Sequence, residues 1–182
     1  MKTRDFVVLA YGAFGGKISG KTNLQKKVYF LGVGLGMESD LGYRPHYYGP
    51  YSASVAEANS ELRSMGYLSE CSTSWGSDNR GFEIARYDYA LTEDGSRLLE
   101  RKQLEYRDIW DKLIAFAEVM KSVGELNYWE LSIAAKSYFI LKSAGAQIGT
   151  KEIQNEALKL GWEVREEEIQ KACEFLERVQ LV

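Results

Sequence analysis

The residues Gly15-Gly-Lys-Ile-Ser-Gly20-Lys21-Thr22 fit the phosphate-binding loop pattern G-x-x-x-x-G-K-[ST]. In such a loop, backbone amides surround a phosphate and the lysine neutralises it. The preceding segment, however, has the periodicity of a helix rather than of a buried strand, and no apolar run leads into an aspartate that could hold Mg²⁺. We therefore rank a nucleotide-binding protein that uses the Gly15 to Thr22 loop below two other interpretations.

Few side chains suit metal or histidine chemistry. His46 is the single histidine, so no second imidazole completes a metal site or a histidine-based triad. Cys71 and Cys173 lie far apart without C-x-x-C spacing, which is typical of buried apolar fillers in a cytoplasmic protein. Glu166-Glu167-Glu168 point in different directions on a helix and suit its first turn. We predict no enzyme activity, no metal and no cofactor.

The charge is distributed unevenly along the 182 residues. The net charge is −3 overall, but residues 1–51 carry seven basic and three acidic side chains, which gives +4. Residues 52–102 carry −3 and residues 103–182 carry −4. Any contact with nucleic acid is therefore expected in the first third of the chain.

Apolar periodicity predicts three helices in the first third of the chain. The first covers Asp5 to Phe14. The second opens at Thr22, with Gln25 three residues later to complete a capping box. The third begins with Ser52 as its cap and ends at Gly66. These helices must position the side chains of any site in this part of the chain.

A β-hairpin is predicted next, because residues 67–71 and 82–91 are rich in aromatic and branched side chains and flank the turn-rich segment 74–81. Thr92 then caps a long helical pattern that runs from Ser96 to Ser122, with or without a kink. The order helix, helix, helix, hairpin, helix is that of a winged helix.

Further helices are predicted over residues 128–142, 150–160 with Thr150 as cap, and 165–179. The spacing of the last two suggests another helix-turn-helix. We predict a mainly α protein with a small β-hairpin wing, of class α+β. Residues 1–102 form a winged-helix domain, and residues 103–182 form a helical domain with a second helix-turn-helix or, alternatively, a reduced second winged helix.

Two motifs carry a family resemblance. The segment Gly20-Lys-Thr-Asn-Leu-Gln-Lys-Lys-Val-Tyr-Phe-Leu31 and the segment Tyr48-Gly-Pro-Tyr-Ser52 ahead of a helix resemble the signature of the YwgA-like family of uncharacterised prokaryotic proteins. A weaker likeness reaches the Panacea (SocA-like) antitoxin domains. The resemblance covers about the first hundred residues. It implies a winged-helix-like fold in which the Gly-Lys-Thr segment caps the second helix, and it implies no catalytic role.

The segment Tyr89-Ala-Leu-Thr-Glu-Asp-Gly95 carries a separate likeness. It is similar to the final wing strand and the following helix of many winged-helix transcription regulators. This likeness favours the same architecture and a regulatory function.

As a DNA-binding protein, the chain would place the helix over residues 52–65 in the major groove. The predicted contacts fall into three groups. Phosphates would be bound by Lys21, Lys26, Lys27 and Arg44, and the hairpin would contribute Arg80 or Arg86. Bases would be read from the helix by Ser52, Ser54, Asn59 and Ser60. Arg63 is the basic residue of this helix. Glu57 and Glu61 on the same helix are unfavourable beside a polyanion.

These acidic residues favour the alternative interpretation, a protein-interaction adaptor that does not bind DNA. Tyr43, Tyr47, Tyr48 and Tyr51 could stack on bases of a single strand, although such aromatics more often close a core or an interface. A homodimer through the helix after Gly95 is predicted on analogy with two-half-site regulators. No run of apolar residues is long enough to span a membrane, so we expect a cytoplasmic protein.

Overall fold

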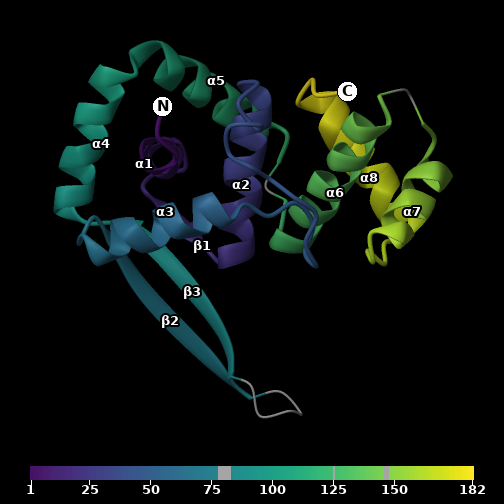
Figure 1. Cartoon of the computed structure of the whole chain (residues 1–182), viewed down its shortest axis with the longest axis horizontal. Coiled ribbons are helices and arrows are strands. Elements are labelled where there is room, and N and C mark those ends of the chain that lie inside the picture. The colour runs from purple at the N-terminus through teal and green to yellow at the C-terminus, as the bar shows by residue number, and fades with distance from the viewer. Residues whose placement is uncertain (78–82, 125, 146–147) are drawn as a thin grey trace.

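The computed structural model describes residues 1–77, 83–124, 126–145 and 148–182, and it confirms the α+β class. The described part is mainly helical with a small antiparallel sheet. The elements follow in the order α1 (Thr3–Ala13), β1 (Lys17–Ser19), α2 (Lys21–Gly34), α3 (Ala53–Ser64), β2 (Leu68–Ser77), β3 (Glu83–Leu91), α4 (Glu93–Glu105), α5 (Arg107–Ser122), α6 (Tyr128–Ala144), α7 (Thr150–Lys159) and α8 (Glu166–Arg178). In Figure 1, β2 and β3 extend away from the helical body, and α6, α7 and α8 form one end of it.

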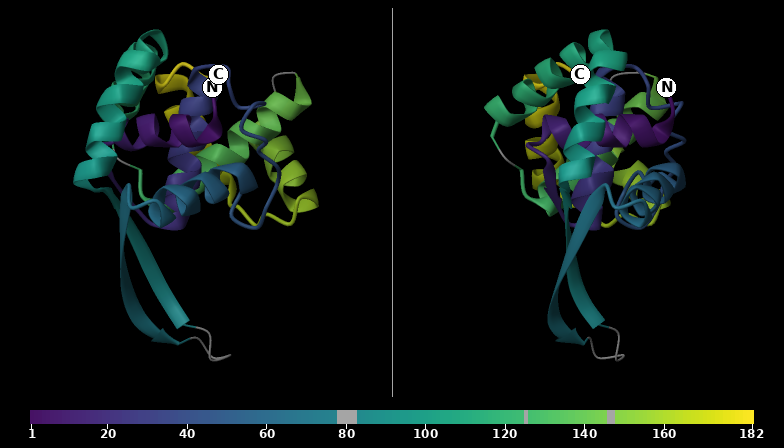
Figure 2. Two further views of the ribbon diagram at one scale, coloured as in Figure 1. Left: turned by 60° about the vertical axis from the view of Figure 1, so that its left-hand side comes forward. Right: turned by 90° about the vertical axis from the view of Figure 1, so that its left-hand side faces the viewer.

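Helix α1 forms the centre of the first hydrophobic core. Every residue from Phe6 to Tyr11 is at most 1% exposed, so the helix is buried on all sides rather than along one stripe. It packs against α3, α4 and α5, and Figure 2 shows α4 and α5 beside it from two further directions. The predicted first helix is thus confirmed, and its position explains its apolar composition.

The sheet has the strand order β1-β3-β2, with both pairs antiparallel. Strands β2 and β3 form the predicted hairpin. Strand β1 was not predicted, and it pairs Ile18 with Tyr89 of β3. Both of these side chains are buried, so the short strand closes the first core against the base of the hairpin.

Helix α2 is shared by two cores. Leu24, Val28 and Leu31 belong to the first core, whereas Tyr29 and Phe30 belong to a second core built mainly from α6, α7 and α8. These two sets of side chains occupy opposite sides of the same helix. One helix of the first half of the chain therefore holds the C-terminal helices in place.

Residue 102, the approximate boundary predicted between the two domains, lies inside α4. Leu113 and Ala117 of α5 are buried in the first core, so this core extends beyond residue 102. The helix predicted from Ser96 to Ser122 is interrupted at Tyr106, where φ is −120° and ψ is 44°. The predicted helices α6, α7 and α8 are confirmed, although Gly149 rather than Thr150 is the cap of α7.

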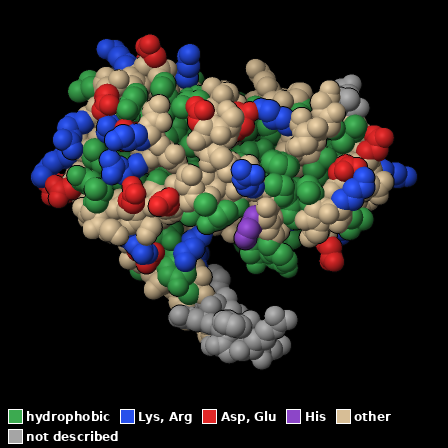
Figure 3. All heavy atoms as spheres, in the orientation of Figure 1, with side chains coloured by type: hydrophobic (Ala, Val, Ile, Leu, Met, Phe, Trp, Pro, Cys, Tyr) green, Lys and Arg blue, Asp and Glu red, His purple; other side chains and the backbone are tan. Residues whose placement is uncertain are grey.

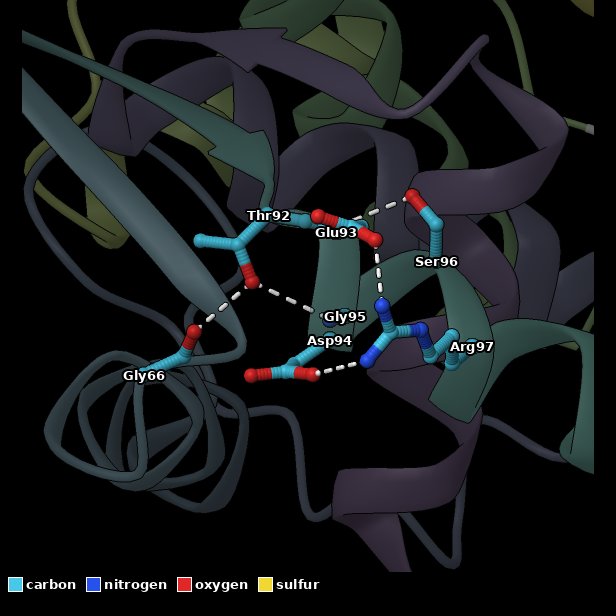
Figure 4. A network of polar contacts seen from close by, with 7 residues as sticks. All are labelled: Gly66, Thr92, Glu93, Asp94, Gly95, Ser96 and Arg97. Carbon is cyan, nitrogen blue, oxygen red and sulfur yellow. Dashed lines mark hydrogen bonds and ion pairs between the residues drawn. The ribbon is translucent and has the colours of Figure 1, made fainter.

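Figure 4 shows why the chain carries Thr92 and Gly95 at the start of α4. The Thr92 hydroxyl accepts a hydrogen bond from the Gly95 amide at 3.0 Å and donates one to the Gly66 carbonyl at 2.7 Å. A Cβ on Gly95 would lie 2.0 Å from the Tyr67 carbonyl oxygen. Arg97 pairs with Glu93 and Asp94 on the outer surface. These contacts connect the end of α3 and the hairpin to the start of α4. The predicted Thr92 cap is confirmed.

The two cysteines are free thiols that differ in exposure. Cys71 is exposed and Cys173 is half-buried, and neither is in a disulfide, so the expectation that both are buried fillers is wrong for Cys71. Among the described residues, no group of His, Cys, Asp and Glu side chains could hold a metal ion, and no helix is long and apolar enough to cross a membrane.

Candidate anion-binding pocket

The two segments that resemble YwgA-like proteins, residues 20–31 and 48–52, are joined by hydrogen bonds in the folded chain. Gln25 and Lys26 of α2 reach across to the segment of residues 46–52, which we call the tyrosine loop. The Gln25 amide bonds to both backbone groups of Ser52, and the Lys26 ammonium donates to the Pro50 carbonyl at 2.6 Å. The Tyr43 hydroxyl donates to the Gln25 carbonyl at 2.9 Å. The first motif therefore holds the second in place.

This geometry corrects the predicted start of α2. Gly20 is the N-cap, Thr22 lies inside the helix, and the cap has no side-chain hydrogen bond. Gln25 does not complete a capping box with Thr22, because its amide is engaged with Ser52. Spacing alone could not show this, since the true partner lies 27 residues further along the chain.

The segment Gly15 to Thr22 does not form the phosphate-binding loop that its residue pattern offered as a lower-ranked alternative. Residues 17–19 are extended and pair with β3, the Gly20 amide donates to the Tyr87 carbonyl at 2.9 Å, and the Gly16 carbonyl accepts from the Leu91 amide at 2.8 Å. Amides in a strand alternate in direction, whereas a phosphate-binding loop turns successive amides toward one point. The pattern G-x-x-x-x-G-K-[ST] is here a strand followed by a helix start.

A cavity of about 500 Å³ opens where α2, α3, β3 and the tyrosine loop meet. Its lining is polar, basic and aromatic, and no Asp or Glu occurs among the described residues that line it. The lining residues are Lys21, Thr22, Leu24, Gln25, Lys26, His46, Tyr48, Tyr51, Ala56, Asn59, Ser60, Arg63 and Tyr89. In Figure 3 the histidine, coloured purple, marks where the tyrosine loop reaches the surface.

Lys26 is the buried cation of this pocket. It is 1% exposed, and in the described part of the chain it has no carboxylate partner, only the Pro50 carbonyl. Burial first, and the positive charge of Lys136 on α6 second, lower the pKa of Lys26 to about 7. The predicted contact between Lys26 and a DNA phosphate is therefore wrong, because the ammonium lies inside the protein.

Lys21 and Arg63 are the exposed cations of the pocket. The Lys21 ammonium lies 3.8 Å from the centre of the Tyr87 ring, and Arg63 pairs with Glu70 of β2. Glu70 is opposite Tyr89 in the sheet, and Tyr87 and Tyr89 lie two residues apart on the same face of β3. Both cations therefore lie at the β3 side of the pocket, which Tyr89 also lines.

Two predicted base-reading residues have structural roles instead. The Ser52 hydroxyl caps α3, accepting from the Val55 amide at 3.0 Å, and Ser52 is fully buried. Asn59 is 7% exposed, and its Oδ1 accepts from the Tyr11 hydroxyl at 2.7 Å. Neither side chain can reach a base in a groove. The predicted Ser52 cap is confirmed.

The remaining predicted contacts are distributed over several surfaces. Lys27 lies on the other side of α2 from the pocket, with its ammonium 4.4 Å from the centre of the Phe14 ring. Arg44 is exposed beside its backbone bridge to Tyr51, Ser54 is exposed on α3, and Arg86 pairs with Asp88. Arg80 lies outside the described residues. The structure thus brings Lys21, Lys26, Asn59 and Arg63 together in one pocket, with Ser60 beside them.

The acidic residues of α3 are not part of the pocket lining. Glu61 lies 3.8 Å from Arg4 of α1, and neither Glu57 nor Glu61 lines the cavity. On α3, the pocket side carries Ala56, Asn59, Ser60 and Arg63 instead. The negative charges of Glu57 and Glu61, which are unfavourable for DNA binding by α3, therefore lie outside the pocket that Arg63 lines.

Three contributors to this region were missed by reasoning from the sequence. Tyr89 closes the pocket from β3, Lys136 faces Lys26 from α6, and Trp162 donates from its indole nitrogen to the His46 carbonyl at 2.6 Å. All of them come from segments far from the two motifs. A lysine in an otherwise buried stretch of a helix, such as Lys136 within 131–137, is the one signal that was available.

No family model matches the chain. Over 94 residues, or 52% of its length, the chain is 32% identical to a protein of Bacillus subtilis (strain 168) described as uncharacterized protein YwgA. The chain spans about half the length of this curated relative, since the matched part covers 52% of it. The similarity supports the resemblance to YwgA-like proteins, and the relative's description assigns no activity.

Proposed function

We propose that this chain is a winged-helix protein that binds double-stranded DNA as a transcriptional or antitoxin-like regulator. The order α1, β1, α2, α3, β2, β3 supports the proposal, with α3 as the recognition helix and the β2–β3 hairpin as the wing. Because α3 packs directly against β2, the two elements would approach a duplex together.

One observation carries the proposal. Two exposed cations, Lys21 and Arg63, line the pocket beside α3, and no carboxylate occurs among its described lining residues, in a chain whose net charge is −3. Such a local excess of cations favours a polyanionic partner. Lys21 and Arg63 would contact phosphates, while Ser60, which lies beside them on the pocket side of α3, would face the groove.

The test is binding of the purified chain to random-sequence duplex DNA over a salt series. The variant Lys21→Glu changes an exposed residue that has no carboxylate partner among the described residues, so it should leave the fold intact. The control Lys151→Glu makes the same charge change at an exposed site on α7. We expect Lys21→Glu to weaken binding and to reduce the salt slope by about 1, while the control binds as the wild type does.

The Lys26 position is unsuitable for this test, because a carboxylate placed there would be buried. Arg63→Gln is the second variant, since it removes the charge without creating a like-charge pair with Glu70. Absence of duplex binding by the wild-type chain at low salt would overturn the proposal, as would equal salt slopes for wild type and Lys21→Glu.

A protein-interaction adaptor is the second candidate, and the tyrosine loop favours it. Tyr47 is 72% exposed and Tyr48 is 47% exposed, with their rings edge to face at a centroid distance of 4.8 Å. Exposed aromatic pairs of this kind are common anchors of protein interfaces. A binding partner lost on Tyr47→Ser, together with unchanged DNA binding by that variant, would support this function.

A further inference from the structure

We propose that the pocket between α2, α3 and the tyrosine loop binds one phosphorylated nucleoside, with the phosphate between Lys21 and Arg63 and the base against the aromatic side of the pocket. The nucleotide is either free or the 5′-phosphorylated end of a strand, and both share this chemistry. Nucleotide binding does not depend on the proposed DNA-binding function. One consequence rests on that function: nucleotide and duplex would compete for Lys21 and Arg63.

The size of the pocket fits such a ligand. Its volume of about 500 Å³ lies well inside the range of roughly 300–1,000 Å³ that is typical of small-molecule sites. It is bounded on several sides, because α2, α3, β3 and the tyrosine loop each contribute lining residues. A duplex, by contrast, would cover only its mouth.

The charge of the pocket fits a phosphate. Lys21 and Arg63 both line the pocket, Lys21 beside Tyr87 and Arg63 beside its ion-pair partner Glu70 of β2. Two cations at one pocket suit a phosphate group, which accepts charge-assisted hydrogen bonds from several directions. Lys26 adds a buried amine whose single described partner is a carbonyl.

The aromatic wall fits a base. The His46 and Tyr51 rings lie 4.9 Å apart and are inclined by 33°, and Tyr48 lines the same wall. Aromatic rings of this kind provide stacking surfaces for bases of any sequence. A pocket built for an inorganic anion alone would not need them.

An amide on the opposite wall provides a polar contact. Asn59 is 7% exposed and lines the pocket, and its Oδ1 is held by Tyr11. Its Nδ2 group is not one of the buried polar atoms that lack a hydrogen-bond partner in the described part of the chain, so it is accessible from the pocket. Ring nitrogens and carbonyl oxygens of a base are suitable acceptors for this amide.

The experiment is isothermal titration of the full chain with adenosine and guanosine 5′-monophosphates, the two nucleosides and inorganic phosphate. A 12-mer single strand is titrated with and without a 5′ phosphate. We expect a 5′-monophosphate or the phosphorylated strand to bind at least about tenfold more tightly than the matching nucleoside or unphosphorylated strand, since the phosphate contributes charge-assisted bonds. Binding of the phosphorylated strand without the free nucleotides would identify the strand end as the ligand.

Variants locate the site. Lys21→Ala should weaken binding about tenfold, whereas the control Lys151→Ala, at an exposed lysine of α7, should bind as wild type does. Tyr51→Leu should reduce the preference for the nucleotide over inorganic phosphate. Equal affinities for nucleotide and inorganic phosphate, absence of binding by every phosphorylated probe, or unchanged binding by Lys21→Ala would overturn the inference.

The outcomes separate this inference from the proposed function. Duplex binding without nucleotide binding would overturn only the nucleotide pocket. Nucleotide binding without duplex binding would overturn only the proposed DNA-binding function. If both occur, adding the bound nucleotide should displace a labelled duplex, and failure to displace it would contradict the shared use of Lys21 and Arg63.

Discussion

The side-chain amide of Gln25 forms two hydrogen bonds with the backbone of Ser52. Its Nε2 donates to the Ser52 carbonyl at 3.0 Å, and its Oε1 accepts from the Ser52 amide at 2.9 Å. Both residues are buried, and the two hydrogen bonds satisfy the backbone amide and carbonyl of Ser52. It fixes the start of α3 against α2, and with the neighbouring bond from Lys26 to Pro50 it shapes one wall of the pocket.

Replacing Gln25 with Leu should therefore destabilise the protein. The buried amide and carbonyl of Ser52 would lose their partners, at a cost of about 2–5 kcal/mol in the free energy of unfolding. Urea unfolding measures this, with Gln170→Leu as the control, because Gln170 is exposed on α8. A loss below about 1 kcal/mol for Gln25→Leu would contradict the role of this pair.

Lys26 makes stability depend on pH. Burial first, and Lys136 second, lower its pKa to about 7 in the folded chain, whereas the unfolded value is about 10.4. Between these values the unfolded chain binds more protons, so the free energy of unfolding contributed by Lys26 rises with pH. The difference between wild type and Lys26→Met should increase in favour of wild type from pH 7 toward pH 10.

Urea unfolding of both proteins at several pH values checks this, and tyrosine titration is common to both and cancels. In the control, Lys151→Met removes an exposed lysine of α7, and its curve should run parallel to that of wild type. A Lys26→Met curve that is also parallel would show that Lys26 is not held in a buried site.

Gly49 is required for two reasons. Its φ is +92°, and an added Cβ would lie 2.9 Å from Cγ of Lys136. Gly36 also has a positive φ, +68°, but nothing lies within 4 Å of its Cβ position. Gly36→Ala should cost about 1–2 kcal/mol from backbone strain alone, and Gly49→Ala should cost clearly more because strain and steric overlap add. Equal losses in thermal unfolding would show that Lys136 moves aside freely.

Trp162 connects the C-terminal helices to the tyrosine loop. Its indole nitrogen donates to the His46 carbonyl, and the side chain is 1% exposed. Trp162→Phe removes this donor and should lower the free energy of unfolding by about 1–2 kcal/mol and increase hydrogen exchange in the tyrosine loop. Trp129→Phe is the control, since Trp129 is 36% exposed and bonds to Glu168 instead. Unchanged exchange in Trp162→Phe would exclude a role in holding the loop.

The two cysteines should react at different rates. Cys71 is exposed, whereas Cys173 is half-buried, and burial followed by the nearby Glu177 and Glu174 raises the pKa of the Cys173 thiol. Because the thiolate is the reactive form, Cys71 should be alkylated faster by about tenfold or more at pH 7.5. Mass spectrometry of partly labelled wild type, with Cys71→Ser as control, measures both rates. Faster labelling of Cys173 would contradict this order.

The elements that were predicted correctly depend on local information. Thr92 and Ser52 cap α4 and α3 because each bonds to an amide three residues away, and the hairpin follows from composition and turn residues. The phosphate-loop pattern could be ranked low from its helical context, but a short motif does not reveal that β3 pairs with residues 17–19. The Thr22 and Gln25 capping box failed because Gln25 has a distant partner.

Local patterns along the chain were enough to predict which segments are helical, where most of them begin and end, and that the positive charge lies in the first third. Access to the basic residues instead follows from the fold, in which Lys26 is buried, Lys21 and Arg63 are exposed, and Glu57 and Glu61 do not line the pocket. Helix formation and capping depend on residues three or four positions apart. Burial and pocket formation instead depend on contacts between α2, α3, β3 and residues 46–52, whose spacing along the chain carries no such signal.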